Sequence, residues 1–267
     1  MNWRAIAAII EKDLKIVLQS KSVAIPLIAV PLLVAGILPL LLGIVLRGID
    51  PSDMQQMLAV LPPGLLQQMA DLTPSQAMLS YMLVYFFAPL YLILPIMVSN
   101  VIAADSFAGE RERKTLEALL YTPTSDGELL TAKLLAAWLP GVGIALLSFV
   151  LYAGVANVVA WPIMEQIFLP NAMWLVLVFW VAPAAAGLGL GTSVFVSARV
   201  NSLQSAYQIG SLIVMPVMGL IIGQISGVLY LDVSMVCLMG LGLWLIDAGL
   251  LWYGRRTFRR SVLIARL

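Results

Sequence analysis

The chain contains no histidine and only one cysteine, Cys237, among its 267 residues. Without histidine there is no imidazole to act as a general base or to bind zinc. A single cysteine excludes a disulfide framework and any paired-cysteine site. Charged residues make up 11% of the chain, whereas soluble domains contain about 25%. The 15 basic and 14 acidic side chains give a net charge of +1, so no basic surplus indicates a nucleic-acid partner.

Apolar residues take the place of the missing charges. The types Ala, Val, Ile, Leu, Met, Phe, Trp, Tyr and Cys make up 61% of the chain, which excludes a soluble globular domain and a disordered chain. Six long stretches carry no charge, except for Asp247 in the last, and each has room for one span of about 20 residues. The sequence therefore predicts an all-α, polytopic membrane protein with six transmembrane helices near 23–46, 78–103, 134–157, 172–197, 207–229 and 233–254.

Lysine and arginine predict the orientation in the membrane. If both termini lie on one side, that side holds fourteen of the fifteen basic residues and the other holds only Arg47. Cytosolic loops are enriched in basic residues, so we expect a multi-pass protein of the inner or plasma membrane with both termini in the cytosol. The fourteen residues are Arg4, Lys12, Lys15, Lys21, Arg111, Arg113, Lys114, Lys133, Arg199, Arg255, Arg256, Arg259, Arg260 and Arg266.

Residues 1–21 precede the first span and have the pattern of an amphipathic helix. Such a helix lies in the membrane interface on the cytosolic side, although a plain cytosolic extension is the alternative. Residues 22–267 then form a single transmembrane domain. The apolar positions at helical spacing are Trp3, Ile6, Ile10, Leu14 and Val17.

No motif for chemistry on a bound substrate occurs in the chain. The patterns GxxxxGK[ST], GxSxG and HExxH are all absent. We therefore predict no catalytic residue, no metal site and no bound cofactor, and we do not expect this chain to be an enzyme.

Asp247 is the one charged residue well inside a predicted span. A carboxylate in the membrane is costly, so it is a functional candidate by default. The alternative is a structural role, in which Asp247 pairs with a basic or polar group such as Arg199 and fixes helix packing.

The segment 105–133, between the second and third spans, is the most informative part of the sequence. A charged entry is followed by an amphipathic helix that presents Leu116, Leu119 and Leu120, and Pro123 ends that helix. Ser125 and Glu128 form a capping-box pattern that starts the next helix. A helix–turn–helix at the membrane surface is suited to docking a cytosolic protein, and a solvated loop with lipid-facing leucines is the alternative.

This segment carries a resemblance to a known family. Residues 108–133 read AGERERKTLEALLYTPTSDGELLTAK, which resembles the signature of type 2 ABC transporter permeases. A weaker similarity to the family lies in the loop before the fifth span, where residues 197–206 read SARVNSLQSA. The order of an N-terminal interfacial helix, six spans and a signature between spans two and three is also similar.

The resemblance implies a function for the chain. A permease of this type is the membrane subunit of an ATP-driven exporter, pairs with a second copy or a paralogue, and docks separate ATPase subunits that bind ATP and Mg²⁺. It works by alternating access, and the segment after the second span receives the motion of the ATPase. The residues expected to bind and couple to the ATPase are Glu110, Arg111, Glu112, Thr115, Leu116, Glu117 and Leu120.

Two other classes of function stay open at this point. A secondary transporter or channel would use Asp247 as its coupling charge, but the chain shows no inverted halves. An intramembrane enzyme would need a second catalytic group, which the absence of histidine and the isolation of Asp247 argue against. The cargo, and the choice between homodimer and heterodimer, do not follow from the sequence.

Overall fold

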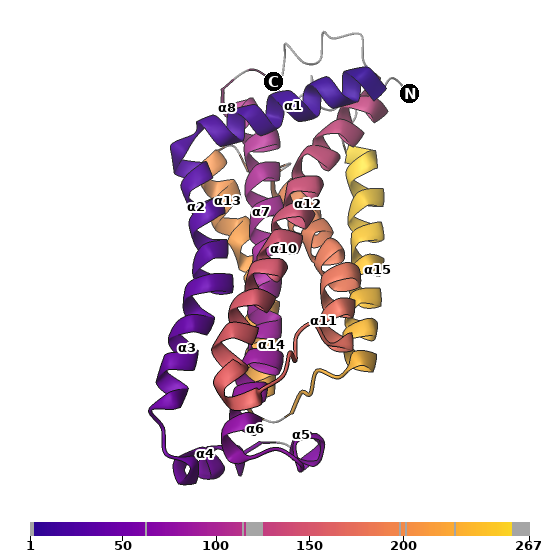
Figure 1. Cartoon of the computed structure of the whole chain (residues 1–267). Helices are drawn as coiled ribbons and strands as arrows, with labels where there is room; N and C mark the ends of the chain where they lie inside the picture. Colours follow the sequence, from indigo (N-terminus) through magenta and orange to yellow (C-terminus); the bar gives the residue numbers. More distant parts are fainter. Residues whose placement is uncertain are drawn as a thin grey trace.

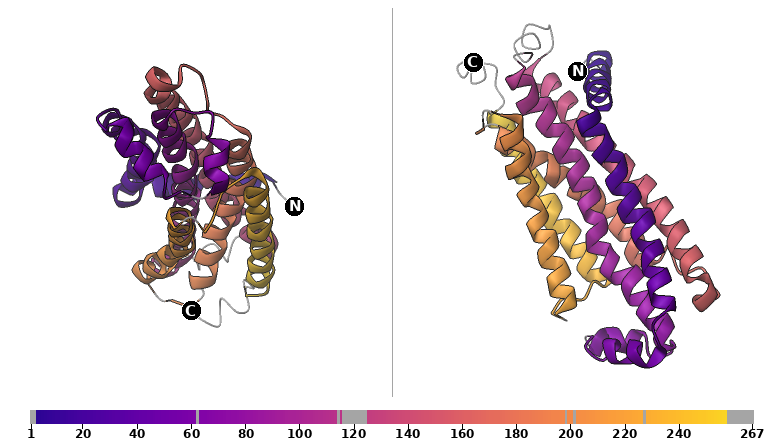
Figure 2. Two further views of the ribbon diagram at one scale, coloured as in Figure 1. Left: turned by 90° about the horizontal axis from the view of Figure 1, so that it is seen from below. Right: turned by 90° about the vertical axis from the view of Figure 1, so that its left-hand side faces the viewer.

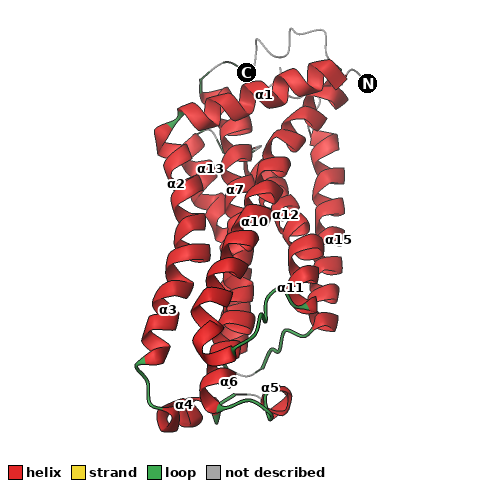
Figure 3. Ribbon diagram, viewed as in Figure 1, coloured by secondary structure: helices red, strands yellow, loops and turns green. Residues whose placement is uncertain are grey.

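The computed structural model describes residues 3–61, 63–113, 115, 125–197, 199–200, 202–226 and 228–257. These residues form helices joined by loops and contain no β-strand (Figure 3). In chain order, with η for π-helical or 3₁₀ segments, the elements are α1 Trp3–Gln19, α2 Lys21–Leu32, η1 Leu33–Ile37, α3 Leu38–Arg47, α4 Pro51–Leu58, α5 Pro63–Gln68, α6 Pro74–Ser80, η2 Tyr81–Phe86, α7 Phe87–Ala104, η3 Asp105–Gly109, α8 Glu110–Glu112, α10 Asp126–Met164, α11 Ala172–Val176, η4 Leu177–Val181, α12 Ala182–Ser197, α13 Leu203–Ser211, η5 Leu212–Val214, α14 Met215–Ile225 and α15 Val233–Thr257.

Six of the described helical stretches are long and apolar enough to cross a membrane. The predicted all-α fold with six membrane spans is therefore confirmed. Figure 1 shows them as a bundle in which the elements of one span follow each other without a break, so that α2, η1 and α3 form a single rod. The six stretches are Val23–Arg47, Pro74–Glu112, Gly127–Met164, Ala172–Ser197, Leu203–Ile225 and Val233–Trp252.

The helices that contain the second and third predicted spans extend beyond those spans at both ends. They comprise 39 and 38 residues, or about 58 Å at 1.5 Å per residue, roughly twice the hydrocarbon thickness of a bilayer. Both begin at a capping box, formed by Thr73 with Gln76 and by Ser125 with Glu128. These helices continue past the apolar residues that predicted the spans 78–103 and 134–157, and the bounds of the membrane-crossing parts stay a prediction.

α1 lies across one end of the bundle (Figure 1). The predicted helix is confirmed, and its buried face consists of Ile6, Ile9, Asp13 and Val17. Ile6, Ile9 and Val17 pack into an apolar cluster with Phe107 and with residues at the start of α10. We call this end of the bundle the α1 end, and the position of α1 in a membrane interface stays a prediction.

The second and fourth spans form the interior of the bundle. In each, 67% of the most apolar window is buried, compared with 17–33% in the other four spans. α7 and α12 pack closely at Gly189, which has no side chain to keep them apart. A Cβ atom there would lie only 2.3 Å from the carbonyl oxygen of Ile96. Small residues allow this kind of helix contact in membranes, and the glycines of the fourth span therefore serve packing within the chain.

The opposite end of the bundle carries α4 and α5, which lie below the spans in both side views (Figures 1 and 2). Arg47 ends the first span there and its guanidinium donates to the carbonyl oxygen of Val159 at 3.0 Å. Helix α15 runs back to the α1 end, where its last described residues lie (Figure 1). Apart from Arg47, the described lysines and arginines belong to segments at the α1 end: α1, the start of α2, the α8 region, the start of α10, the α12–α13 loop and the end of α15. The expected cytosolic position of this end stays a prediction.

The orientation itself predicts a labelling pattern. Cysteines introduced at Ser52 and Gln166, both exposed and both at the α4–α5 end, should react with a membrane-impermeant maleimide added to intact cells. Cysteines at the exposed positions Ser125 and Glu11 should react only after the cells are opened. Cys237 is exposed and must be replaced by Ala throughout. Reaction of the cysteine in Ser125→Cys in intact cells would show that the predicted orientation is wrong.

Candidate coupling site at the α1 end of the bundle

The second span carries its helix out of the apolar region and directly into a charged turn. α7 continues through the π-helical segment η3 into α8 without interruption. π-helical turns are rare and often occur at functional sites. In this one, the side chains of Asp105, Ser106 and Glu110 are all buried, so the segment after the second span begins inside the protein.

The ammonium group of Lys133 lies at the centre of this buried region. Lys133 is fully buried, and its Nζ atom lies 2.5 Å from Glu110 Oε2. It also donates to the carbonyl oxygen of Ser106 at 2.7 Å and to its hydroxyl at 3.1 Å. A buried ammonium group is stable only when it is paired and hydrogen-bonded, and here Ser106 of η3 and Glu110 of α8 supply the partners of this lysine of α10.

α1 completes this arrangement with one charge of each sign. Asp13 accepts a hydrogen bond of 2.6 Å from the Ser106 hydroxyl and lies 3.7 Å from Lys133 Nζ. Lys12 lies 2.5 Å from Glu110 Oε1 and 3.0 Å from Asp13 Oδ1. We call Lys12, Asp13, Ser106, Glu110 and Lys133 the buried ion cluster; its two lysines and two carboxylates balance.

The opposite charges of the cluster change the pKa of Lys12. Burial on its own lowers the pKa of this side chain, but the hydrogen bond and charge of Glu110, together with Asp13, outweigh that effect and raise the pKa above its ordinary value of 10.5. Lys12 therefore stays charged, and the cluster joins α1, α8 and α10 by ionic contacts.

A second ion pair lies beside the cluster. The guanidinium of Arg113 donates two hydrogen bonds of 3.1 Å to the two carboxylate oxygens of Asp105. Gly109 lies under this pair: a Cβ atom there would be 3.0 Å from both Arg113 and Asp105. The bidentate pair ties Arg113, just after the end of α8, to the first residue of η3.

Arg111 and Glu112 bind the loop that enters the fifth span. Arg111 donates to the carbonyl oxygen of Ser197 at 2.9 Å and more weakly to that of Val200 at 3.4 Å. Glu112 accepts a hydrogen bond of 2.7 Å from the backbone NH of Leu203, the first residue of α13. A carboxylate at a helix N-terminus is favourable because the first NH groups lack partners within the helix. The two segments singled out in the sequence, 105–133 and 197–206, are thus in contact.

A comparison with protein families identifies the class of this chain. Residues 7–236 match the family model described as ABC-2 family transporter protein. The chain belongs to the ABC-2 transporter family. Searches among curated proteins and solved structures gave no match. Family members are the membrane subunits of ABC transporters and work with ABC ATPases, so the chain is a type 2 ABC transporter permease.

The structure separates the predicted coupling residues of the permease into three groups. Glu110 lies inside the buried ion cluster, with 2% of its surface exposed. Arg111, Glu112 and Thr115 lie at the start of the segment, and the Thr115 hydroxyl donates to the carbonyl oxygen of Glu110 at 3.3 Å. The other three lie outside the described residues: Leu116, Glu117 and Leu120. Their contact with an ATPase stays a prediction.

Asp13 and Lys133 were not singled out as site residues by the sequence reasoning. Asp13 carries a readable signal, since it falls on the buried stripe of α1 at helical spacing from Ile6, Ile9 and Val17. A carboxylate in an apolar stripe needs a buried partner of opposite charge. The identity of that partner is a matter of tertiary packing.

Asp247 is buried in the sixth span against the fourth. Its side chain is 2% exposed, and neither carboxylate oxygen has a hydrogen-bond partner among the described residues. The suggested pairing with Arg199 is absent: the Arg199 guanidinium lies 3.6 Å from the centre of the Phe195 ring and donates to the Phe195 carbonyl oxygen. Asp247 instead contacts Gly187, where a Cβ atom would lie 2.3 Å from its Oδ2.

Proposed function

We propose that this permease exports its cargo by alternating access, driven by ATPase subunits that dock at the α1 end on the cytosolic side. The observation that carries the proposal is the set of contacts made by residues 105–133. Through Glu110 and Lys133 the segment is joined to α1 and α10, and through Arg111 and Glu112 it is joined to the α12–α13 loop. Four spans therefore meet at one segment.

This arrangement gives a physical route from docking to transport. An ATPase shifts the conformation of the permease only if it binds one state more tightly than the other. A docking segment joined to the second, third, fourth and fifth spans by ion pairs and hydrogen bonds would move those spans together. In this proposal the permease is no enzyme itself, since ATP and Mg²⁺ are held by the ATPase.

The proposal includes a second permease subunit, either a copy of this chain or a paralogue. The first, fifth and sixth spans leave most of their surface exposed, with 17–28% of the most apolar window buried. Apolar helix faces of this kind lie against lipid or against another membrane subunit. We place the assembly in the inner or plasma membrane, with no nucleic-acid partner.

Loss of the docking residues should separate the permease from its ATPase. Truncating one partner of a desolvated charge pair costs about 2–5 kcal/mol, or about thirtyfold and more in affinity. We expect Glu117→Ala to weaken co-purification of the ATPase by about this factor and Leu116→Asp to weaken it further. The measurements are pull-down and ATP-dependent transport, with size-exclusion chromatography to verify folding.

Asp53→Ala in α4 is the matched control, because it removes a carboxylate at the opposite end of the bundle. It should leave co-purification and transport unchanged. Normal docking and normal transport in both segment variants would show that residues 105–133 do not couple to the ATPase.

A secondary transporter is the second candidate function, and the buried carboxylate of Asp247 without a described partner favours it. In that case the permease alone, reconstituted in vesicles, would move cargo in response to a proton or sodium gradient. Transport that requires ATP and the ATPase would decide for the exporter.

A further inference from the structure

Three successive backbone carbonyls of η2, the π-helical segment of the second span, accept hydrogen bonds from side chains of other spans. Two of these bonds come from the interior of the bundle. The carbonyl oxygen of Leu83 accepts from the Tyr152 hydroxyl of α10, and that of Val84 accepts from the Trp174 indole NH of α11 at 2.9 Å. The two donor rings are buried and stack with their centres 4.7 Å apart. The third and fourth spans are thus fixed to η2 by packed aromatic donors.

The third bond comes from the fifth span. The carbonyl oxygen of Tyr85 accepts from the side-chain amide of Gln224 in α14 at 3.1 Å. The buried residues of α14 are Val217, Ile221 and Gln224, and 22% of the most apolar window of this span is buried. Gln224 Oε1 is buried and has no hydrogen-bond partner among the described residues, so it would gain hydration if the contact opened. A neutral hydrogen bond therefore holds a lightly packed helix against η2.

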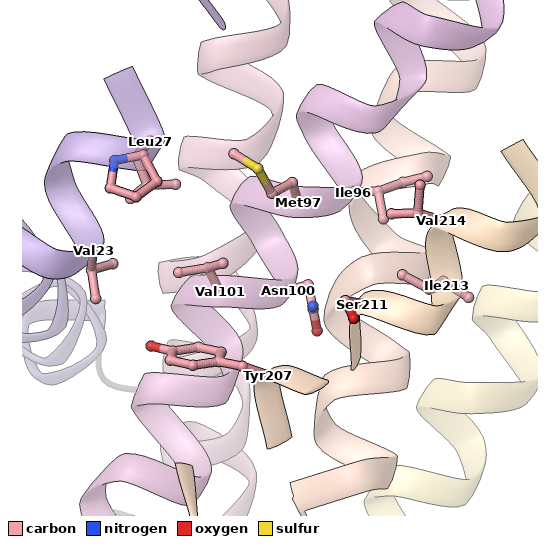
Figure 4. A pocket seen from close by; sticks show the side chains of 11 residues that line it. Val23, Leu27, Ile96, Met97, Asn100, Val101, Tyr207, Ser211, Ile213 and Val214 are labelled. Atoms are coloured by element: carbon pink, nitrogen blue, oxygen red, sulfur yellow. The ribbon is translucent and has the colours of Figure 1, made fainter. Parts of the chain in front are cut away.

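The helix of the fifth span is interrupted before it reaches this bond. The 3₁₀ segment η5 separates α13 from α14, and Pro216 lies in the first turn of α14. Proline has no NH to continue the helix hydrogen bonds, and a 3₁₀ stretch in mid-helix is typical of a hinge. Ile213 and Val214 of η5 line a cavity of about 280 Å³ beside α7 (Figure 4). The interruption therefore has free space next to it.

α13, on the other side of η5, is fixed to the segment that we propose as the docking site. Ala206 of α13 is fully buried and packs with Ala104 and Ala108 of the second span. Glu112 accepts a hydrogen bond from the backbone NH of Leu203 at 2.7 Å. The fifth span thus consists of a fixed part at the α1 end, a hinge at η5 and a lightly held part, α14.

We propose that Gln224 is a latch: its hydrogen bond to the Tyr85 carbonyl oxygen holds α14 against η2, and the bond breaks when α14 swings about η5 to open the α4–α5 end of the permease. The opening step rests on the proposed export function. A hydrogen bond depends steeply on distance and angle, so it is made in one closed position and lost after a small displacement. Tyr152 and Trp174 keep η2 in place while Gln224 leaves it.

Labelling of a buried thiol measures this opening. Ile221→Cys places the thiol on the buried face of α14, one turn before Gln224, where the parent side chain is 8% exposed. Cys237 is replaced by Ala in every variant. The full permease–ATPase complex in nanodiscs is treated with a water-soluble maleimide, which reaches a buried thiol only through local opening. Ser52→Cys, exposed in α4, gives the unhindered rate. Both faces of a nanodisc are accessible, so the orientation in the membrane does not affect the result.

A change at position 224 by one methylene group tests the latch. Gln224→Asn keeps both polar atoms of the amide but shortens the side chain, so the bond to Tyr85 is lost. Without nucleotide it should raise the labelling rate of Ile221→Cys about fivefold, as for one hydrogen bond. Gln208→Asn, the same substitution at an exposed position of α13, is the matched control and should leave the rate unchanged. An unchanged rate in Gln224→Asn would overturn the latch.

Tyr152→Phe shows whether the latch is specific to the fifth span. It removes the donor to the neighbouring carbonyl of Leu83, and we expect it to lower the thermal stability of the complex without raising the labelling rate of Ile221→Cys. Equal increases in Tyr152→Phe and in Gln224→Asn would overturn the proposal, because closure would then depend on η2 as a whole.

Nucleotide tests the opening step. With ATP and vanadate, the labelling rate of Ile221→Cys should rise about fivefold or more, while Val98→Cys, fully buried in α7, stays protected. Pro216→Ala supplies the NH that continues the helix through η5, so it should reduce this rise by about half. The same labelling rate of Ile221→Cys with and without nucleotide would overturn the opening step.

The latch and the export proposal fail separately. A fivefold effect of Gln224→Asn without nucleotide, in a complex that shows no ATP-dependent transport, would keep the closed contact and refute export. ATP-dependent transport in a complex whose labelling does not respond to Gln224→Asn would keep export and refute the latch.

Discussion

Lys133→Met is expected to destabilise the permease by about 3–5 kcal/mol, because removal of one partner leaves uncompensated charge in a buried ionic site. Lys133 is fully buried and is bonded to Glu110 and Ser106. Without its ammonium group, the cluster holds two carboxylates and only Lys12 to neutralise them. The measurement is the free energy of unfolding in detergent, or the thermal midpoint of the size-exclusion peak.

A second substitution should recover much of this loss. In Glu110→Gln with Lys133→Met, the remaining charges are Lys12 and Asp13, which lie 3.0 Å apart and balance. We expect the double variant to be more stable than the sum of the single effects predicts, by about 2 kcal/mol. Lys15→Met, on the exposed side of α1, is the control and should change stability by less than about 0.5 kcal/mol. Additive effects would mean that the two side chains do not interact.

Asp247→Asn should leave the isolated permease at least as stable as the parent. In the complex with the ATPase, the same substitution should strongly reduce transport. A carboxylate in the middle of a membrane helix costs about 2.5 kcal/mol or more, and no described group offsets this cost by a hydrogen bond to Asp247. Removing the charge therefore removes a cost without breaking a contact. A buried charge without a partner lowers the stability of the fold, and a residue that does so without a structural benefit is expected at a functional site.

The stability of Asp247→Asn is measured by thermal unfolding and its activity by transport per folded complex. Loss of stability would reveal a structural partner and refute this account. Gly187→Ala gives an independent probe of the same contact, since a methyl group there would lie 2.3 Å from Asp247 Oδ2. We expect it to destabilise by about 1–3 kcal/mol, and Asp247→Ala in the same chain to restore most of the loss.

The six spans were predictable because they depend on local composition. A bilayer needs about 20 apolar residues in a row, and each gap between charges contains one such stretch. The capping boxes at Thr73 and Ser125 were also readable, since a cap depends on residues three positions apart. How far the helices continue beyond the second and third spans was not predictable, because the apolar run that indicates a span stops where the helix becomes polar, although the helix itself continues.

The candidate coupling site was predictable as a segment and not as a set of contacts. Glu110 sits among charged neighbours in the sequence, which is typical of a solvated face, yet it is buried. Its partner Lys12 is 98 positions away, and its partner Lys133 belongs to another helix. Pairings over such separations follow from how α1, α8 and α10 pack, which no local pattern encodes.

The unbroken length of α10 gives the permease a lever. The helix holds 39 residues and stays continuous through Pro140, so a rocking of about 10° about its midpoint would displace each end by about 5 Å. Lys133 fastens one end to Glu110, in the segment that we propose as the docking site of the ATPase. At the other end the carbonyl oxygen of Ile163 accepts a hydrogen bond from Gln76 of α6. A push at the α1 end would therefore arrive at the far face of the membrane in the opposite direction, opening one side as the other closes.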